Sequence, residues 1–388
     1  MEALTPEDPS WIGHYRLLAR LGAGGMGTVY LGRSPAGRTA AVKVIHSRLA
    51  HDPEFRRRFR AEVRAAQRVD GAFTAPVLDF DTDGSAPWLA TGYVPGLSLE
   101  EAAGVSGEPL PAASVWWLAA GLAAALQNIH DNGLVHRDLK PSNVMLTLDG
   151  PRVIDFGVAR VVDASVVTRT GAVIGSPGFM SPEQVRGLHA ASSSDVFSLG
   201  SVLAFAATGR APFGDSSVGS YALMLKVVQD DPDLTGVPEG LAELIRRCMS
   251  KDPAVRPSPG VIASAAAKET AGRHLGAWLP PELIVQIGKR TSRLLDLGSP
   301  PGTQLDGAPP QRATPPGPPT DRADRPHRVI RIHTPSRRPN TGVRRGRIPR
   351  RPYHRGPRRR ACRSVVRRRR TDAGRGCSSP RPPSPASC

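Results

Sequence analysis

The first ninety residues alternate apolar and polar positions over short stretches, a pattern typical of β-strands. The segments "TVYLG" (28–32) and "TAAVKVI" (39–45) are rich in strand-forming residues, and the turn-like "RSPAGR" joins them, which predicts a hairpin. The following "EFRRRFRAEVRAAQRV" (54–69) has a helical composition without Gly or Pro. The sequence therefore predicts a β-rich unit with one helix from about residue 12 to 93.

From residue 97 to 275 the pattern becomes mostly helical. Between residues 112 and 133, apolar residues recur every three or four positions, as on one face of a helix, and a glycine follows as a stop signal: Val115, Leu118, Leu122, Leu126, Ile129 and Gly133. The segment "PPELIVQIGKRTSRLL" (280–295) predicts one more amphipathic helix.

The composition changes sharply after residue 297. Eighteen of the 39 prolines lie from residue 300 onward, and apolar residues become too sparse to offset the chain entropy lost on folding. We therefore expect residues 298–388 to be disordered. Residues 321–388 hold 22 Arg, no Lys and 3 Asp, a net charge of +19, so the rest of the +18 chain sums to about −1.

This arginine-rich tail has two interpretations. It could contact nucleic acid or an anionic membrane through counterion release. Alternatively, Arg and Pro codons are GC-rich and Lys codons are AT-rich, so 22 Arg without Lys is also what an out-of-frame, GC-rich translation gives. Both interpretations stay open at the level of sequence.

The cysteines and the N-terminus indicate a cytoplasmic protein. Cys248, Cys362, Cys377 and Cys388 lack metal-ligand spacing, and the pattern suits a reducing compartment. The N-terminal "MEALTPEDPS" is acidic and has no apolar core, so it does not predict a secretory signal. With no run of about 18 apolar residues, we expect no transmembrane helix.

The segment "LGAGGMGTVY" places Gly22, Gly24 and Gly27 at G-x-G-x-x-G spacing, which allows a backbone to approach phosphates. Such a triplet also occurs in ordinary turns. A Rossmann dinucleotide site would need a helix directly afterwards and an acidic residue about 20 positions on. Here a β-rich segment follows and the distance leads to Lys43, so a glycine hairpin over a nucleotide fits better.

Lys43 is the only lysine in the first 139 residues and sits in an apolar run. A lysine at a strand edge can simply extend its ammonium to solvent, but a buried ammonium needs a partner. Glu62, on the predicted helix, is the acidic residue that could pair with it. A Lys43–Glu62 ion pair would orient the ammonium towards α- and β-phosphates.

The densest group of chemical side chains is "VHRDLKPSNVML" (135–146). Asp138 can accept a hydroxyl proton, Lys140 can neutralise a γ-phosphate, and Asn143 offers an oxygen ligand suited to Mg²⁺. Further along, "VIDFGVAR" places Asp155 after an apolar strand, as a second metal ligand. These are the parts that phosphoryl transfer needs.

Taken together, these motifs resemble those of protein kinases, specifically the eukaryotic-like Ser/Thr kinases of bacteria. The matching segments are "GAGGMG", "AVK" ending at Lys43, "HRDLKPSN", "DFG" (155–157), "SPE" (181–183), "SSSDVFSLG" and "DPAVRPS". The resemblance covers about residues 13–275 and implies an α+β, two-lobed fold. It places a β-rich lobe at about 13–91 and a mainly helical lobe at about 92–275, followed by the additional helix within 276–297.

The resemblance also implies roles for individual residues. Asp138 would orient and deprotonate the substrate hydroxyl with Lys140 beside it, Lys43 and Glu62 would position phosphates, and Asn143 with Asp155 would hold Mg²⁺ or Mn²⁺. ATP would be bound by Leu21, Gly22, Ala23, Gly24, Gly25, Met26, Gly27, Thr28, Val29, Ala41, Lys43, Thr91, Tyr93, Val94 and Met145. Asp195 would brace the catalytic loop, and Glu183 and Arg256 would form a buried ion pair.

The departures from the family pattern are mild: "SPE" replaces the usual "APE", Gly92 replaces a frequent Glu, and Ser176 replaces a Thr. The segment between "DFG" and "SPE" contains Thr168 and Thr170, which we expect to be autophosphorylated, with a homodimer as one route. A phosphate on either threonine would bind Arg137, next to Asp138.

The sequence thus predicts an active ATP-dependent kinase that phosphorylates Ser and Thr of proteins. Two alternatives from other classes are a catalytically inactive pseudokinase scaffold and a nucleic-acid-binding protein that relies on the basic tail. The intact Lys43, Asp138, Asn143 and Asp155 argue against the scaffold.

Overall fold

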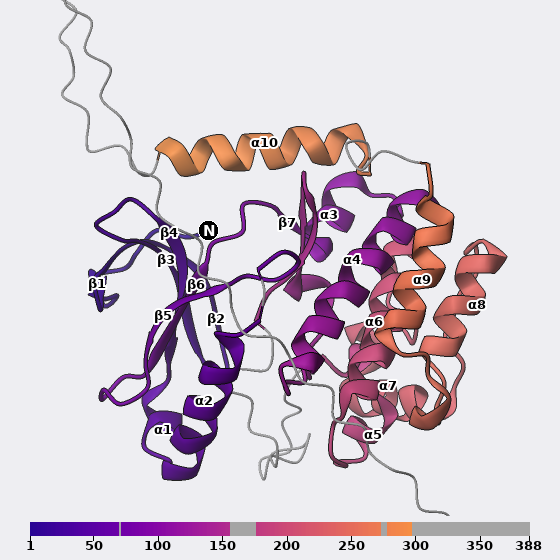
Figure 1. The fold of residues 1–388 in the computed structure, drawn as a ribbon, viewed down its shortest axis with the longest axis horizontal. Helices are drawn as coiled ribbons and strands as arrows, with labels where there is room; N and C mark the ends of the chain where they lie inside the picture. The colour runs from indigo at the N-terminus through magenta and orange to yellow at the C-terminus, as the bar shows by residue number, and fades with distance from the viewer. Residues whose placement is uncertain (70, 156–175, 273–277, 297–388) are drawn as a thin grey trace, which may run out of the picture. The chain divides into compact units, whose positions relative to one another are not determined.

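The computed structural model describes residues 1–69, 71–155, 176–272 and 278–296. Thr168, Thr170 and the tail expected to be disordered lie outside the described residues. The described part forms a sheet-rich N-terminal lobe and a mainly helical C-terminal lobe, as the sequence predicted (Figure 1).

The N-terminal lobe is built on a six-stranded antiparallel sheet of order β1-β2-β3-β4-β6-β5. Its strands are β1 (Trp11–Ile12), β2 (Tyr15–Gly24), β3 (Gly27–Arg33), β4 (Thr39–Ile45), β5 (Val77–Asp81) and β6 (Trp88–Gly92). A short helix, α1 (Ser47–Ala50), and a longer one, α2 (Pro53–Ala66), connect β4 to β5.

The alternation of side chains along β3 and β4 gives the sheet two different faces. Tyr30, Ala40 and Val42 are buried on one face with Trp88. Because successive strand residues point to opposite faces, Lys43 lies on the other face together with its directly paired neighbour Val29 and with Ala41.

Helix α2 begins at Asp52, whose carboxylate accepts a hydrogen bond from the Glu54 backbone N–H, with Pro53 at the first helical position. Phe55, Phe59 and Val63 recur at intervals of four and are each at most 2% exposed. This buried stripe packs the helix into the core and fixes the direction in which Glu62 points.

The C-terminal lobe packs helices around one long central helix. Its helices are α3 (Leu99–Ser106), α4 (Ala112–Asp131), α5 (Pro182–Val185), α6 (Ser192–Thr208), α7 (Ser220–Gln229), α8 (Glu239–Cys248), α9 (Pro259–Thr270) and α10 (Pro281–Asp296). A small antiparallel sheet of β7 (Leu97–Ser98), β8 (Val144–Thr147) and β9 (Gly150–Val153) carries the loop between α4 and β8.

Within the described ranges, α4 is the helix whose length and mean hydropathy of 1.3 would suit a membrane span. However, 56% of that apolar window is buried, and α4 packs against α6, α9 and β9. Its apolar positions Leu118, Leu122 and Leu126 are fully buried. In this structure α4 is the core helix of the lobe.

Helices α6 and α8 approach closely at Gly200. A Cβ at Gly200 would lie 2.6 Å from the Met249 Cγ and 2.9 Å from the Cys248 Cβ, so the contact requires a residue without a side chain. Cys248 is fully buried there, and burial raises the pKa of its thiol to about 12.

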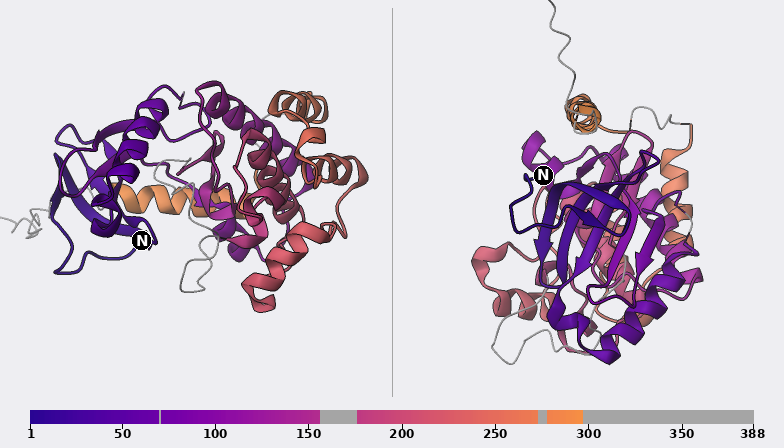
Figure 2. Two further views of the ribbon diagram at one scale, coloured as in Figure 1. Left: turned by 90° about the horizontal axis from the view of Figure 1, so that it is seen from below. Right: turned by 90° about the vertical axis from the view of Figure 1, so that its left-hand side faces the viewer.

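The last helix, α10, runs lengthwise beside both lobes (Figures 1 and 2). Leu283 and Ile287 are buried in the main core, and α10 contacts α3 and β7 of the C-terminal lobe. Leu294, in contrast, clusters with Ala19 and Leu31 of the N-terminal sheet. One helix therefore contacts both lobes.

Candidate active site

The glycine-rich turn joins β2 to β3, and its last cross-strand pair is Gly24 with Gly27. A Cβ added at Gly22, Gly24 or Gly25 would meet no atom within 4 Å, so the space beside these residues is open. A Cβ at Gly27 would lie 1.9 Å from the Val44 carbonyl oxygen. Gly27 is thus required by the packing of β3 against β4, while the other three leave room for a ligand.

Two residues that were not identified from the sequence, His46 and Arg48, contact the backbone of this turn. The His46 Nε2 lies 3.0 Å from the Gly24 carbonyl oxygen, and the His46 N–H donates to the Met26 carbonyl at 2.9 Å. The Arg48 guanidinium donates to the Gly25 carbonyl. Their position just after the Lys43 strand is the sequence signal that could have identified them.

The residues expected to contact adenine lie on two surfaces. Val29 and Ala41 are on the sheet face that carries Lys43, and Ala41 pairs with Thr91 across the strands. Val94 and Met145 are together in a second, buried cluster with Ala75, against which Ile154 packs.

The loop at 136–143 brings its polar side chains together, as expected. The Asn143 Nδ2 donates to the Asp138 carbonyl at 2.8 Å and lies 3.4 Å from the Asp138 Oδ2. The Lys140 ammonium is 3.2 Å from the same Oδ2. The carboxylate, positioned by its own loop, can receive a proton, and the ammonium beside it can neutralise an anion.

Asp195, on α6, fixes the backbone of this loop. Its carboxylate accepts hydrogen bonds from the backbone N–H groups of His136 and Arg137, both at 2.8 Å, and lies 2.7 Å from the His130 Nε2. Asp195 is 1% exposed, and Arg137 has a φ of 64°. A left-handed arginine costs free energy, and these bonds hold the loop in that conformation.

His136 links the loop to the strand end that carries Asp155, another role that the sequence did not reveal. It is fully buried, and burial lowers its pKa, so the imidazole stays neutral. Its Nε2 lies 3.2 Å from the Ile154 carbonyl oxygen and its Nδ1 3.3 Å from the Asp138 N–H. This network assigns the proton to Nε2 and leaves Nδ1 to accept.

The expected Lys43–Glu62 ion pair is wrong for this structure. The Lys43 ammonium lies 3.4 Å from the Asp155 carboxylate, and Glu62 instead accepts a hydrogen bond from the Arg137 guanidinium at 2.8 Å. Sequence spacing could not show this, because the packing of α2 decides which of two cations reaches Glu62. Arginine is also the better partner for a partly buried carboxylate, since its guanidinium is weakly hydrated.

The expected metal ligands have suitable chemistry and are tied together by the backbone. The Ile154 N–H donates to the Asn143 carbonyl at 3.0 Å, which holds the strand end with Asp155 beside the loop. Because the Asn143 Nδ2 is occupied by Asp138, its side-chain oxygen is the group left for a cation. Across the described ranges no three His, Cys, Asp or Glu side chains form a metal cluster. Two hard oxygen ligands fit an ion whose other ligands are phosphates and water.

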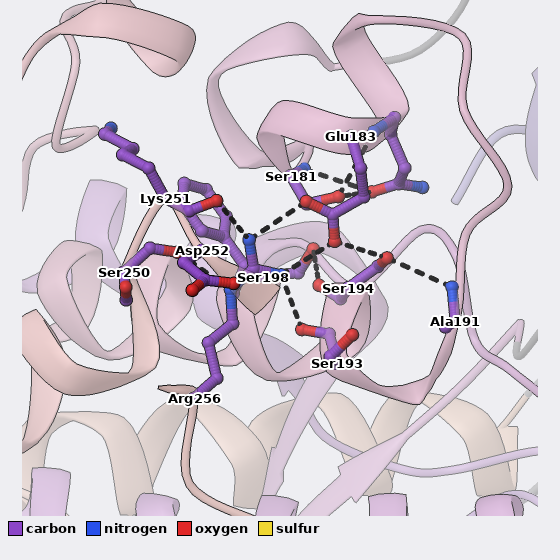
Figure 3. A network of polar contacts seen from close by, with 12 residues as sticks. Ser181, Glu183, Ala191, Ser193, Ser194, Ser198, Ser250, Lys251, Asp252 and Arg256 are labelled. Atoms are coloured by element: carbon purple, nitrogen blue, oxygen red, sulfur yellow. Dashed lines mark hydrogen bonds and ion pairs between the residues drawn. The ribbon is translucent and has the colours of Figure 1, made fainter. Parts of the chain in front are cut away.

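Glu183 and Arg256 form the centre of a buried polar network (Figure 3). Arg256 donates to the two Glu183 carboxylate oxygens at 2.7 and 2.9 Å, and Ser194 donates to one of them at 2.6 Å. The Arg256 guanidinium also donates to the carbonyls of Ser250 and Ser193. Burial alone would raise the pKa of Glu183, but the hydrogen bonds from Arg256 and Ser194 lower it to about 2.

Gln184, next to Glu183, connects this network to the loop. Its Nε2 donates to the Arg137 carbonyl at 2.9 Å, and its Oε1 accepts from the Ser181 N–H at 3.1 Å. The capping pair Ser181 and Gln184 thus starts α5 and also holds the 136–143 loop. The role of Gln184 is not apparent from the sequence alone.

A cavity of about 860 Å³ adjoins the end of the 136–143 loop. It is lined by Pro141, by residues 176–179 and by α7 and the segment before it. Five acidic residues (Glu100, Asp215, Asp230, Asp231, Asp233) and two basic ones (Arg210, Lys226) line it, so its charge is predominantly negative. Through Pro141, the cavity is in contact with the loop that carries Asp138.

Comparison with known proteins agrees with this geometry. The family model for the protein kinase domain matches residues 15–269. The probable serine/threonine-protein kinase PkwA of Thermomonospora curvata is 49% identical over 299 residues, which cover 77% of this chain and 39% of that protein. The serine/threonine-protein kinase AfsK of Streptomyces coelicolor is 48% identical, over 76% of this chain and 37% of its own length.

The similarity to PkwA extends beyond the family model. Because 77% of 388 residues is about 299, the matched part reaches about residue 299 even if it begins at Met1, and so includes α10. The chain spans less than two fifths of the length of these two relatives. Among solved structures, the PknI kinase domain of Mycobacterium tuberculosis is 27% identical, with a TM-score of 0.54, over 69% of this chain and 99% of that chain.

Proposed function

The chain belongs to the protein kinase family, and from that premise we propose that it transfers the γ-phosphoryl group of ATP to serine and threonine hydroxyls of proteins. The observation that carries the proposal is the set of Asp138, Lys140 and Asn143 in one braced loop, beside the Lys43–Asp155 pair. Phosphoryl transfer depends mainly on positioning and charge neutralisation, and these residues supply both.

Each of these residues has a distinct task in the proposed reaction. Asp138 orients the acceptor hydroxyl and takes its proton, and the Lys140 ammonium neutralises negative charge that develops beside it. Lys43 binds phosphate oxygens of the nucleotide. When bound, a divalent cation, Mg²⁺ or Mn²⁺, would shield the phosphates, and Asn143 with Asp155 would hold it.

The nucleotide is proposed to bind between the glycine turn and the apolar residues described above. The open positions at Gly22, Gly24 and Gly25 allow backbone N–H groups to approach the phosphates. Val29, Ala41 and Met145 would enclose the adenine, with the backbone at 92–94 providing polar contacts.

The protein substrate is proposed to enter along the acidic cavity. Its wall at 176–179 and Pro141 adjoins the loop that carries Asp138, so a segment bound there presents a hydroxyl to the carboxylate. Autophosphorylation of Thr168 or Thr170, with or without a homodimer, remains part of this proposal. A phosphate on either residue would compete with Glu62 for Arg137 and free Glu62 for Lys43.

The wider organisation is proposed on the same basis. The catalytic domain would occupy residues 13–275, followed by the additional helix within 276–297 and the basic tail at 298–388, and the protein would be cytoplasmic. The positive charge of the tail would favour its contact with nucleic acid or an anionic membrane.

Two substitutions test the proposed reaction. Asp138→Asn and Lys43→Met should each lower phosphotransfer from Mg²⁺-ATP to a peptide by about 10²-fold or more while the protein stays folded. Asp149→Asn and Lys268→Met make the same changes at exposed positions and should leave the rate unchanged. A rate above roughly a tenth of wild type in either test variant would overturn the assigned roles.

A further inference from the structure

Helix α10 carries a stripe of four side chains that lie on one face along its length. Leu283, Ile287, Arg290 and Leu294 are spaced by four, three and four residues, so they share one helix face. The family model ends at residue 269, before this helix begins. The stripe therefore adds contacts that the kinase domain as usually delimited does not contain.

The first part of the stripe is anchored in the C-terminal lobe. Leu283 is fully buried and Ile287 is 2% exposed, both in the main core. Just before the helix, Trp278 is 3% exposed and its Nε1 donates to the Thr147 carbonyl at 3.0 Å, on the strand that also carries Met145. The start of α10 is therefore buried to the same extent as the core helices of the lobe.

The middle of the stripe reaches the segment that links the lobes. The Arg290 guanidinium donates to the Glu101 Oε2 at 2.7 Å, and that oxygen also accepts from the Ser98 N–H at the start of α3. Burial raises the pKa of the Tyr93 phenol, and the nearby positive charge of Arg290 offsets part of that rise. Arg290 thus lies between α3 and the side chain of Tyr93.

The end of the stripe contacts the N-terminal sheet. Leu294 is 9% exposed and clusters with Ala19 and Leu31, and Leu21 and Tyr93 pack against the same cluster. The Arg33 guanidinium donates to the Leu294 carbonyl at 3.5 Å. Leu21 and Tyr93 are two of the residues proposed to bind the nucleotide, so α10 touches that site from behind.

We propose that α10 is part of the nucleotide-binding unit, in which Arg290 and Leu294 are positioning residues that set Tyr93 and Leu21 against the adenine. This inference rests on the proposed function, since it concerns the same ATP site. Neither residue touches the phosphates; both act on the adenine end. The similarity that extends through α10 to about residue 299 is consistent with a helix that serves the domain itself.

The test is equilibrium nucleotide binding by the full chain, with two probes. Arg290→Ala and Leu294→Ala should each weaken Mg²⁺-ATP binding by roughly tenfold, the equivalent of about 1.4 kcal/mol. Binding of inorganic triphosphate with Mg²⁺, which has no adenine, should change less than about twofold. Arg290→Lys keeps the charge but not the forked geometry, so it should recover part of the loss.

Arg293→Ala is the matched control, because it removes the same charge from an exposed position on the same helix and should leave both affinities unchanged. Equal weakening of both probes would mean that α10 acts by general loosening of the lobes, and the adenine-positioning role would be rejected. Unchanged ATP affinity in Arg290→Ala, a partly exposed residue whose loss spares the core, would reject it as well.

Because the readout is binding, the test is independent of phosphotransfer. The same comparison can be made in the Asp138→Asn background, where transfer is expected to be lost and binding retained. Failure of ATP to bind the wild-type chain at all would instead overturn the proposed function.

Discussion

Two arginine–glutamate pairs in this molecule have similar chemistry and opposite surroundings. Arg256 and Glu183 lie within one lobe, share two hydrogen bonds, and the arginine side chain is 0% exposed. Arg137 and Glu62 join the 136–143 loop to α2 of the other lobe, through a bond of 2.8 Å, with side chains 18% and 14% exposed. The first pair is enclosed by serine and backbone partners that all belong to its own lobe.

The difference teaches which ion pair can exchange partners. To break the Glu183–Arg256 pair, the lobe must open, because each charge would otherwise stay buried without compensation. The Glu62–Arg137 pair can separate through a relative shift of α2 and the loop, after which water reaches both groups. The enclosed pair stabilises the scaffold, and the bridging pair is suited to a change of state.

The largest expected effect comes from breaking the enclosed pair. Glu183→Ala leaves a buried guanidinium without its carboxylate, so the free energy of unfolding should fall by about 3–5 kcal/mol, measured by urea denaturation. Glu239→Ala is the control, because Glu239 pairs with Arg246 on the exposed face of α8. If both variants unfold at the same urea concentration, the contrast drawn above is wrong.

The second effect is a dependence of stability on acid. Because the folded pKa of Glu183 is lowered to about 2 from an ordinary value of 4.5, its contribution is present above pH 4.5 and is lost as the pH falls towards 2. The free energy of unfolding should drop by roughly 3 kcal/mol more over this range in wild type than in Glu183→Gln. Parallel pH profiles for the two proteins would contradict this assignment.

A smaller effect separates two glycines of the same turn. Gly27→Ala places a methyl group against the Val44 carbonyl and should lower the free energy of unfolding by about 1–3 kcal/mol. Gly24→Ala meets open space, so it should leave stability unchanged and weaken ATP binding instead. Thermal unfolding and nucleotide titration of both variants check this, and identical behaviour would show that one constraint governs the whole turn.

The smallest expected effect concerns the bridging pair. In a double-mutant cycle of Glu62→Gln and Arg137→Gln, the coupling energy for stability should be on the order of 1 kcal/mol or less, because water can replace the partners. Phosphotransfer should fall in both single variants. A coupling energy as large as the loss of about 3–5 kcal/mol expected for Glu183→Ala would show that this pair is part of the fixed scaffold.

The sequence predicted features that depend on local order along the chain. The hairpin at 28–45, the helix with Phe55 and Val63, and the polar loop around Asp138 follow from short-range periodicity and spacing. The sequence also anticipated that Glu183 and Arg256 would form an ion pair, by family resemblance, although 73 positions separate them.

What the sequence did not predict depends on tertiary packing. The choice of Glu62 between Lys43 and Arg137 is decided by how α2 sits over the loop, which no spacing records. The hydrogen bonds of His136 depend on an imidazole being surrounded by both the loop and the Ile154 backbone. The apolar stripe on α10 was visible as a sequence pattern, but the two hydrophobic clusters that it contacts were not predictable from it.

The tight contact between α6 and α8 makes the reactivity of Cys248 a measure of how often these helices separate. Cys248 is the only cysteine before residue 362, and it is sealed in that contact with a thiol that is protonated at neutral pH. A thiol-reactive dye can modify it only when the helices part, since both burial and protonation prevent reaction. The rate of labelling at Cys248 therefore reports how often the C-terminal lobe opens, without introducing a new cysteine.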